Sequence, residues 1–399
     1  MNILFVNDIP FNPFYGGIER VTDNIVKGLL TLGKGYKFYY LFFKIHKREI
    51  LQYEFPARIF ECPFEGGFDS KENIEYYINI LDEYEIDIVV NQRGGVSIMN
   101  NALSLTRQSK VVSVIHSDIN YWIYKKSFLC YHTCNKSFKS ILKYILKKIN
   151  PYLWSKYVSW TIAPYLKSHY NEMANISDAI VVLSKKYIKD LESYIVRSNT
   201  KIYSIPNPNT FDTQKIDFSL KRNEILYVGR LDSAEKTPIL LLQIWRKIYK
   251  KHLDWKLVIV GEGCAKDEMN SYVNKYKLPR VFFEGVKSNI EDYYKSASVV
   301  CLTSVSEGWG MALTEGMTFG CVPFTFNNSG SAYDIIDNNI NGCLISAYNI
   351  KEYAERLSDV LSDKQMRITM SQRSIEKSKK FSIEKVIKKW DELFEKLKS

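Results

Sequence analysis

Two carboxylates eight positions apart, Glu307 and Glu315, are the side chains of this chain best placed to do chemistry. The β-branched run at 299–303 predicts a buried parallel strand before them, and good helix formers predict a helix that starts near Gly310. The first turn of a helix leaves backbone N–H groups unpaired, and the helix dipole favours anions. The residues between the carboxylates that would supply these amides are Gly308, Trp309, Gly310, Met311 and Ala312.

A phosphate could rest on these amides while Glu307 and Glu315 accept hydrogen bonds from hydroxyl groups on either side. A nucleotide sugar presents that series of groups, because its diphosphate separates the ribose hydroxyls from the hexose hydroxyls. The stretch therefore predicts a nucleotide-sugar site that lies between a strand and a helix.

Two cations belong to the same prediction. Arg230 comes directly after a predicted strand at 224–228 and Gly229, and Lys236 follows six residues later. Both can reach the carboxyl end of a parallel sheet, where ligands bind in doubly wound folds. Two cations there would neutralise a diphosphate leaving group as its negative charge develops. Taken alone, the pair would be interpreted as two exposed surface charges.

The N-terminal half offers weaker candidates. Gly16 and Gly17 lie between a predicted strand at 3–7 and a predicted helix at 18–32, where glycines let the backbone approach a phosphate closely. His116 ends a predicted strand and would face a cleft, although a buried histidine with satisfied hydrogen bonds explains it equally well. Neither Gly16-Gly17 nor the segment 261–263 forms the G-x-G-x-x-G fingerprint, so a nicotinamide cofactor is poorly supported.

The alternation of predicted strands and helices positions these residues in two Rossmann-like α/β domains. We expect an N-terminal domain at 1–205 and a C-terminal, nucleotide-sugar-binding domain at 206–380, with the boundary at a proline-rich joint. A last helix within 381–399 carries an apolar stripe that needs a partner surface and would pack back on the first domain. The stripe consists of Val386, Trp390 and Phe394.

The constellation resembles the retaining glycosyltransferases of family 4, which have the GT-B fold of two Rossmann-like domains facing across a cleft. The segments that carry the resemblance are Gly16-Gly17-Ile18-Glu19-Arg20, His116, Gly229-Arg230-Leu231 with Lys236, and Glu307-Gly308-Trp309-Gly310 with Glu315. Two positions depart from the family pattern: Trp309 stands where Phe is more usual, and Asp334 where Glu is common.

The resemblance implies a role for each of these residues. Glu307 would bind hydroxyls of the transferred sugar, and Glu315 would bind the ribose. Arg230 and Lys236 would hold the diphosphate, helped by the backbone of Gly16 and Gly17, and His116 would lie near the sugar and the acceptor. The bond would form with retention, and neither a metal nor another cofactor would be needed.

Charge and composition bear on the partners. The net charge is +11, and the interval 119–171 contains lysines and aromatic residues but no Asp or Glu. Such a segment suits an anionic membrane surface, and a solvated basic helix with an aromatic core face explains it as well. Nucleic acid is a weaker alternative. The sequence has no apolar run long enough to span a membrane and no signal peptide, and its seven cysteines follow no regular framework. These observations predict a cytoplasmic protein. If the segment 119–171 binds membrane, the contact would be at the inner face of the plasma membrane.

A C-x-H-x-C cluster at Cys130, His132 and Cys134 has no second ligand pair at zinc-like spacing, so we expect no metal site there. The leading hypothesis is a hexosyltransferase that moves a sugar from a nucleoside diphosphate donor, UDP-linked, to a glycan or lipid-linked glycan in surface polysaccharide synthesis. A nucleotide-sugar epimerase on the same fold and a non-catalytic, membrane-associated scaffold are the alternatives.

Overall fold

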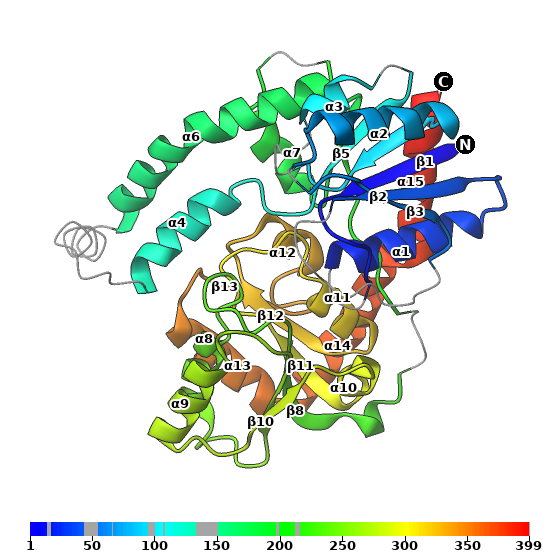
Figure 1. The fold of residues 1–399 in the computed structure, drawn as a ribbon. Coiled ribbons are helices and arrows are strands. Elements are labelled where there is room, and N and C mark those ends of the chain that lie inside the picture. The colour runs from blue at the N-terminus through cyan, green and yellow to red at the C-terminus, as the bar shows by residue number, and fades with distance from the viewer. Residues whose placement is uncertain are drawn as a thin grey trace. The chain divides into compact units, whose positions relative to one another are not determined.

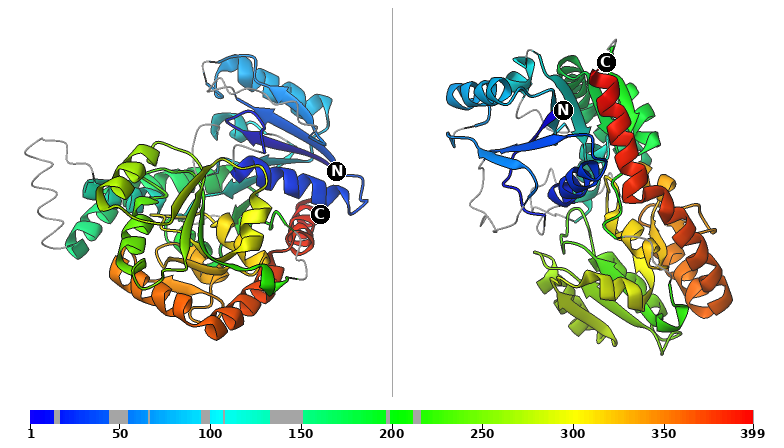
Figure 2. Two further views of the ribbon diagram at one scale, coloured as in Figure 1. Left: turned by 90° about the horizontal axis from the view of Figure 1, so that it is seen from below. Right: turned by 90° about the vertical axis from the view of Figure 1, so that its right-hand side faces the viewer.

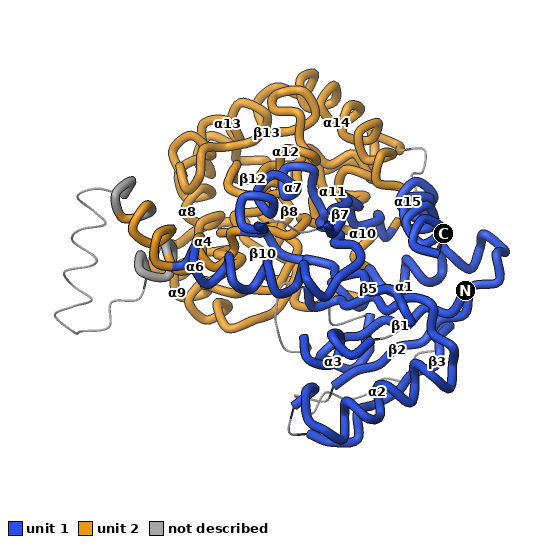
Figure 3. Tube along the Cα trace, turned by 90° about the horizontal axis from the view of Figure 1, so that it is seen from above, with its two compact units in different colours: residues 1–119, 162–210, 383–399 blue, residues 120–161, 211–382 orange. Residues whose placement is uncertain are grey.

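The computed structural model has two parallel β-sheets, each with helices packed against it (Figures 1 and 2). The residues that it describes are 1–13, 17–43, 55–65, 67–94, 100–106, 108–132, 151–196, 199–211 and 216–398. They form two compact units (Figure 3). The first unit comprises residues 1–119, 162–210 and 383–399, and the second comprises residues 120–161 and 211–382.

The first unit contains a seven-stranded parallel sheet in the order β3-β2-β1-β4-β5-β6-β7. Its strands are β1 (Asn2–Asn7), β2 (Lys37–Phe42), β3 (Arg58–Glu61), β4 (Ile88–Asn91), β5 (Lys110–Ile115), β6 (Ala179–Val182) and β7 (Lys201–Ser204). The central strands are buried along almost their whole length, as expected of a sheet covered on both faces. The direction of strand addition reverses between β1 and β4, which places a topological switch point there.

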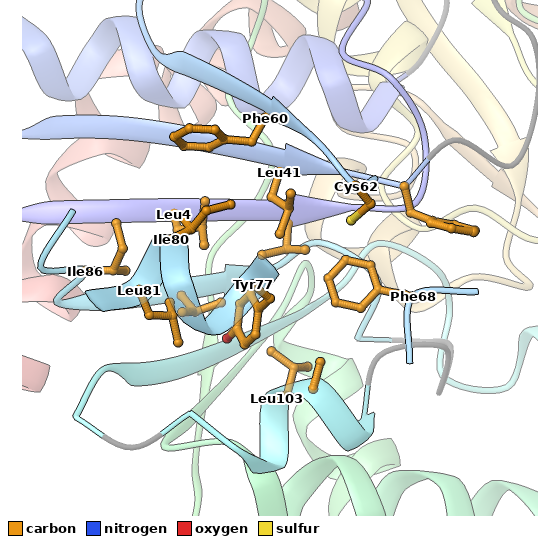
Figure 4. Close-up of a cluster of buried hydrophobic side chains, with 14 of the residues drawn as sticks. Leu4, Leu41, Phe60, Cys62, Phe68, Tyr77, Ile80, Leu81, Ile86 and Leu103 are labelled. Carbon is orange, nitrogen blue, oxygen red and sulfur yellow. The ribbon is translucent and has the colours of Figure 1, made fainter. Parts of the chain in front are cut away.

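The helices that accompany this sheet are α1 (Gly17–Leu30), α2 (Lys71–Glu83), α3 (Asn100–Ser104), α7 (Lys185–Glu192) and α15 (Ile383–Lys398). Between β5 and β6 the chain forms α4 (Tyr121–His132) and α6 (Pro151–Ile176). Figure 4 shows the core between α2 and the sheet, where Tyr77, Ile80 and Leu81 of α2 share one buried cluster with Leu4 and Leu41 of the strands. Leu103 of α3 closes the cluster.

The second unit contains a six-stranded parallel sheet in the order β10-β9-β8-β11-β12-β13. Its strands are β8 (Arg222–Val228), β9 (Lys256–Val260), β10 (Val281–Gly285), β11 (Ala297–Cys301), β12 (Val322–Phe326) and β13 (Cys343–Ile345). Its helices include α8 (Ile239–Ile248), α9 (Lys266–Tyr276), α10 (Ile290–Ser296), α11 (Met311–Thr318), α12 (Gly330–Ile335), α13 (Ile350–Ser362) and α14 (Lys364–Ser378). Here the switch point lies between β8 and β11.

Helix α15 packs against α1 in the first unit, and its apolar stripe is buried there. The two helices approach closely at Gly28, where an added Cβ would lie 2.4 Å from Ile387 Cγ1. The Tyr36 hydroxyl donates to Asp391 Oδ1 at 2.7 Å, and Lys34 Nζ lies 2.9 Å from Asp391 Oδ2. The apolar stripe of α15 thus has its partner surface on α1.

The predicted α/β class is confirmed, and the predicted strands and helices near the candidate site residues are present to within a few residues. The edge strands β3, β7 and β13 were not predicted, because they are short and alternate weakly. In the part of the chain that the structure describes, no helix combines the length and the apolarity that crossing a membrane requires.

Candidate functional site

The loops that follow β8 and β11 are bonded to each other at the switch point of the second unit. Val305 N donates to Glu235 O at 2.7 Å. Thr237 Oγ1 donates to Thr303 O at 2.5 Å, and Thr303 Oγ1 returns a bond to Thr237 O at 3.1 Å. Both threonines are buried, so these bonds fix the two loops relative to one another.

This frame brings Lys236 and Glu307 together. Lys236 Nζ lies 2.7 Å from Glu307 Oε1 and 2.8 Å from Oε2. Ser304 Oγ donates to Oε1 at 2.6 Å, and the backbone N–H of Glu307 donates to Ser329 Oγ at 2.7 Å. The side chains of Lys236 and Glu307 are 24% and 13% exposed, so the pair is largely shielded from water and strongly oriented. The predicted phosphate-binding lysine and the predicted sugar-binding carboxylate are therefore direct neighbours.

Helix α11 begins at Met311, as the sequence predicts, and its start is not capped by a side chain. The N-cap is Gly310 in the left-handed region, with φ 80° and ψ 52°, which glycine adopts without strain. Gly308, Met311 and Ala312 are partly exposed, and they belong to the loop that carries Glu307 and to the first turn of α11. This geometry suits an anion.

The side chains of Trp309 and Glu315 are both almost fully buried. The Trp309 ring is 3% exposed and packs edge-on against Phe381 at a centroid distance of 5.0 Å, so that only its backbone remains available to the predicted phosphate site. Glu315 is 2% exposed, and its Oε2 accepts a bond from the hydroxyl of Tyr294 in α10 at 2.8 Å. The sequence suggested neither partner, since each lies on a distant segment.

Arg230 is 67% exposed and contacts Glu235, where Nη2 lies 3.1 Å from Oε2. The structure places it on the same loop as Lys236, but the two cations bind different carboxylates. Sequence reasoning missed Glu235, which stands directly before Lys236 and could have been noticed as a carboxylate between two predicted phosphate-binding cations.

Close backbone contacts explain why positions 261 and 263 are glycines. A Cβ at Gly261, whose φ is 139°, would lie 1.9 Å from Gly229 O, and a Cβ at Gly263 would lie 2.3 Å from Leu231 O. The backbone after β9 thus lies directly against the backbone that precedes and follows Arg230, and Leu231 N donates to Glu262 O at 2.9 Å. These glycines do not form a dinucleotide fingerprint; they position the Arg230 loop.

In the first unit, His116 follows β5 and is held by neighbouring side chains. Its Nε2 is bonded to Gln92 Oε1, and Gln92 Nε2 donates to Thr22 Oγ1 at 3.1 Å. Because Gln92 Oε1 only accepts, His116 carries its proton on Nε2. Burial, with a smaller contribution from the charge of Arg93, lowers the pKa of His116 to about 3, so the ring is neutral near pH 7.

Of the two glycines predicted to approach a phosphate, Gly17 begins α1, and a Cβ there would meet nothing within 4 Å. Gly16, Cys134 and the lysines at 136–148 lie outside the described residues. Within the described ranges, no group of three or more His, Cys, Asp or Glu side chains could hold a metal ion.

Solved structures similar to this chain over nearly its whole length show the fold. A complex of Staphylococcus aureus TarM with fondaparinux, α-GlcNAc-glycerol and UDP has a TM-score of 0.72 at 15% identity, covering 98% of this chain and 99% of that chain. Anabaena HepE in complex with UDP and glucose has a TM-score of 0.71 at 17% identity, covering 99% and 100%. The two Rossmann-like units thus define a protein of the GT-B fold.

The C-terminal half matches a family model. Residues 209–380 are similar to the glycosyl transferases group 1. An uncharacterized glycosyltransferase of Haemophilus influenzae is 32% identical over 190 residues, which cover 47% of this chain and 54% of the relative. The amylovoran biosynthesis glycosyltransferase AmsD of Erwinia amylovora is 27% identical over 226 residues, which cover 55% and 62%.

A Campylobacter jejuni α-1,4-N-acetyl-D-galactosaminyltransferase, whose name specifies a PP-undecaprenol-linked glycan, is 28% identical over 209 residues, which cover 52% of this chain and 58% of the relative. The chain therefore spans between about half and three fifths of the length of these three curated relatives.

Proposed function

We propose that this protein is a retaining glycosyltransferase that transfers a hexose from a nucleoside diphosphate sugar to a glycan or lipid-linked glycan in the synthesis of a surface polysaccharide. The observation that carries the proposal is the Lys236–Glu307 pair, fixed at the switch point of the second unit and followed by the uncapped start of α11. A cation, a carboxylate and the amides of a helix start together match a sugar joined to a diphosphate.

Lys236 would bridge the sugar and the diphosphate. It uses two of its three N–H donors on Glu307, so the third would bind a phosphate oxygen while Glu307 accepts from a sugar hydroxyl. Arg230 and the amides of 308–312 would neutralise the remaining phosphate charge as the bond to the sugar breaks. With this charge supplied by the protein, we propose that no metal is required.

The other predicted residues complete the assignment. Glu315, oriented by Tyr294, would accept from a ribose hydroxyl. His116 would accept a hydrogen bond from the sugar or the acceptor at Nδ1, because its Nε2 proton is directed at Gln92. Gly16 and Gly17 would let the backbone approach the phosphate.

The names of similar proteins support the donor and the acceptor class. TarM and HepE were solved with UDP, which favours UDP as the nucleotide here. The relatives named for amylovoran biosynthesis and for a PP-undecaprenol-linked glycan favour a polymeric or lipid-linked acceptor.

Calorimetric titration of UDP, GDP, UDP-hexoses and GDP-hexoses tests the donor. We expect binding of a UDP-sugar, and loss of at least about tenfold in affinity when Arg230 and Lys236 are both replaced by Ala, because two charge-assisted contacts to phosphate disappear. Glu315→Ala should weaken UDP binding as well. Unchanged UDP binding in both variants would refute the site. Conversion of the donor to a different nucleotide sugar without any acceptor would instead indicate an epimerase.

We also propose that the segment 119–171 contacts an anionic membrane surface. Aromatic side chains that are unusually exposed lie along α4 and α6: Trp122 at 42%, Tyr157 at 51%, Trp160 at 74% and Tyr165 at 55%. Exposed lysines accompany them on these helices, and the interval has no acidic residue.

Sedimentation with liposomes that contain anionic lipid tests this contact. Binding should weaken as salt is raised, and replacing Lys143, Lys147 and Lys148 by Glu should reduce it further. Equal binding to neutral liposomes at every salt concentration would contradict the proposal.

A further inference from the structure

Three side chains converge on Glu235, which has no role in the assignment above. We call these four residues the Glu235 cluster: Glu235, Arg230, Tyr121 and Lys125. The Tyr121 hydroxyl donates to Glu235 Oε1, and Lys125 Nζ lies 3.2 Å from the same oxygen and 2.8 Å from the Tyr121 hydroxyl. Arg230 Nη2 lies 3.1 Å from the other oxygen, Oε2. Both oxygens of the carboxylate are therefore occupied, one by α4 and one by the predicted phosphate-binding arginine.

The backbone of Glu235 is fixed as firmly as its side chain. Its N–H donates to Asp232 Oδ1 at 2.7 Å, and its carbonyl accepts from Val305 N at 2.7 Å. The next residue is Lys236, whose side chain turns to Glu307. Glu235 thus lies between the two cations proposed to bind the diphosphate, and it contacts one of them directly.

The cluster combines one carboxylate, Glu235, with two cations, Arg230 and Lys125, so its net charge is positive. The Glu235 side chain is 27% exposed. Although burial acts to raise its pKa, the hydrogen bonds from Tyr121 and Lys125 lower the pKa of Glu235 below its ordinary value. The carboxylate is therefore ionised, and it orients Arg230 through one of the five guanidinium N–H groups on a side chain that is 67% exposed.

We propose that Glu235 is a positioning residue of the diphosphate site, which orients Arg230 and joins it to the first turns of α4 through Tyr121 and Lys125. The inference rests on the proposed function, because the diphosphate is its ligand. When a diphosphate binds the outer donors of Arg230, the guanidinium loses mobility, and Glu235 transmits this loss to Tyr121 and Lys125. Binding of the nucleotide and ordering of α4 are thereby coupled.

The chain offers a matched control at Glu284. This carboxylate also accepts from a tyrosine, Tyr293, whose hydroxyl lies 2.8 Å away, and also pairs with a lysine, Lys287, at 3.4 Å. Its side chain is 31% exposed, close to the 27% of Glu235, and it belongs to β10 and not to the loop that carries Arg230. Glu284→Gln and Glu235→Gln remove the same charge from similar surroundings.

The experiment compares wild type, Glu235→Gln and Glu284→Gln by UDP titration and by hydrogen exchange of the amides at 121–126 with and without UDP. Gln keeps the size of Glu but cannot hold Arg230 as an ion pair. We expect Glu235→Gln to bind UDP about tenfold more weakly, and Glu284→Gln to bind it like the wild type. UDP should slow exchange at 121–126 in wild type and Glu284→Gln, and leave it unchanged in Glu235→Gln.

A double-mutant cycle separates coupling from general destabilisation. If Lys125 acts through Glu235, Lys125→Met weakens UDP binding in the wild type and adds nothing in Glu235→Gln. Equal UDP affinity of Glu235→Gln and the wild type, or an unchanged UDP effect on 121–126 in that variant, overturns the inference. Absence of UDP binding to the wild type itself is a different outcome, which overturns the proposed function.

Discussion

Acidification should destabilise the first unit, because His116 stays neutral in the folded state. Its ordinary pKa of 6.5 is lowered to about 3 by burial first and by the charge of Arg93 second. Arg93 is itself held by Asp8, with Nη2 and Oδ2 2.9 Å apart, so the positive charge near the imidazole is fixed. The first unit therefore binds fewer protons at this site than its unfolded chain does at any pH between these two pKa values.

The sign and the size follow from this difference. The stabilising contribution of neutral His116 is complete above pH 6.5 and is lost as the pH falls toward 3. At pH 4.5 the unfolded histidine is two pH units below its pKa, while the folded one is still neutral. The free energy of unfolding of the first unit should therefore fall by about 2.7 kcal/mol between pH 7.5 and 4.5 through this residue.

Two measurements check this prediction. Ring NMR signals, assigned with the variant His116→Gln, should show no titration of His116 above about pH 5. Native-state hydrogen exchange of β5 should show that His116→Gln lacks the pH-dependent loss that the wild type has. Gln92→Glu is the matched variant, because a carboxylate at that position would raise the pKa of the imidazole. A His116 signal that titrates near pH 6.5 in the wild type would refute the reasoning.

Three substitutions test the frame of the site and the last helix. Lys236→Met should lower the free energy of unfolding of the second unit in urea by about 2–3 kcal/mol, because Glu307 loses its charge partner in a shielded position. A loss below about 0.5 kcal/mol would mean that the pair is screened like a surface pair. Gly261→Ala should lower the free energy of unfolding of the second unit by at least about 3 kcal/mol, because its Cβ would overlap a backbone oxygen at 1.9 Å. A melting temperature equal to that of the wild type would contradict this. Tyr36→Phe should cost about 1.5–2 kcal/mol by removing the bond to Asp391, measured by urea unfolding of the first unit; equal stability would show that α15 is held by its apolar stripe alone.

The elements around the candidate site could be predicted from local sequence signals. A β-branched run before Glu307 gave a buried strand, and the glycine at 310 marked the start of α11. Ser184 caps α7, accepting a bond from Lys186 N at 3.2 Å. These signals act within a few residues, because strand periodicity, helix periodicity and capping depend on neighbours along the chain.

The partners of the site residues could not be predicted in the same way. Lys236 and Glu307 are separated by 71 positions, and Tyr121 and Glu235 by 114. Such pairs meet only because the strand order places the loop after β8 beside the loop after β11 and because α4 reaches the first of these loops. The burial of Trp309 against Phe381 and of Glu315 against Tyr294 has the same origin.

The amino-acid sequence by itself determined the α/β class, the positions of the strands and helices near the site and the kinds of charge that follow β8 and β11. Only the tertiary structure decided which side chains pair: Lys236 with Glu307, Arg230 with Glu235, and Lys125 of α4 with Glu235. The physical reason is that local conformation follows from nearby residues, whereas pairing across a sheet depends on the order in which the whole chain lays down its strands.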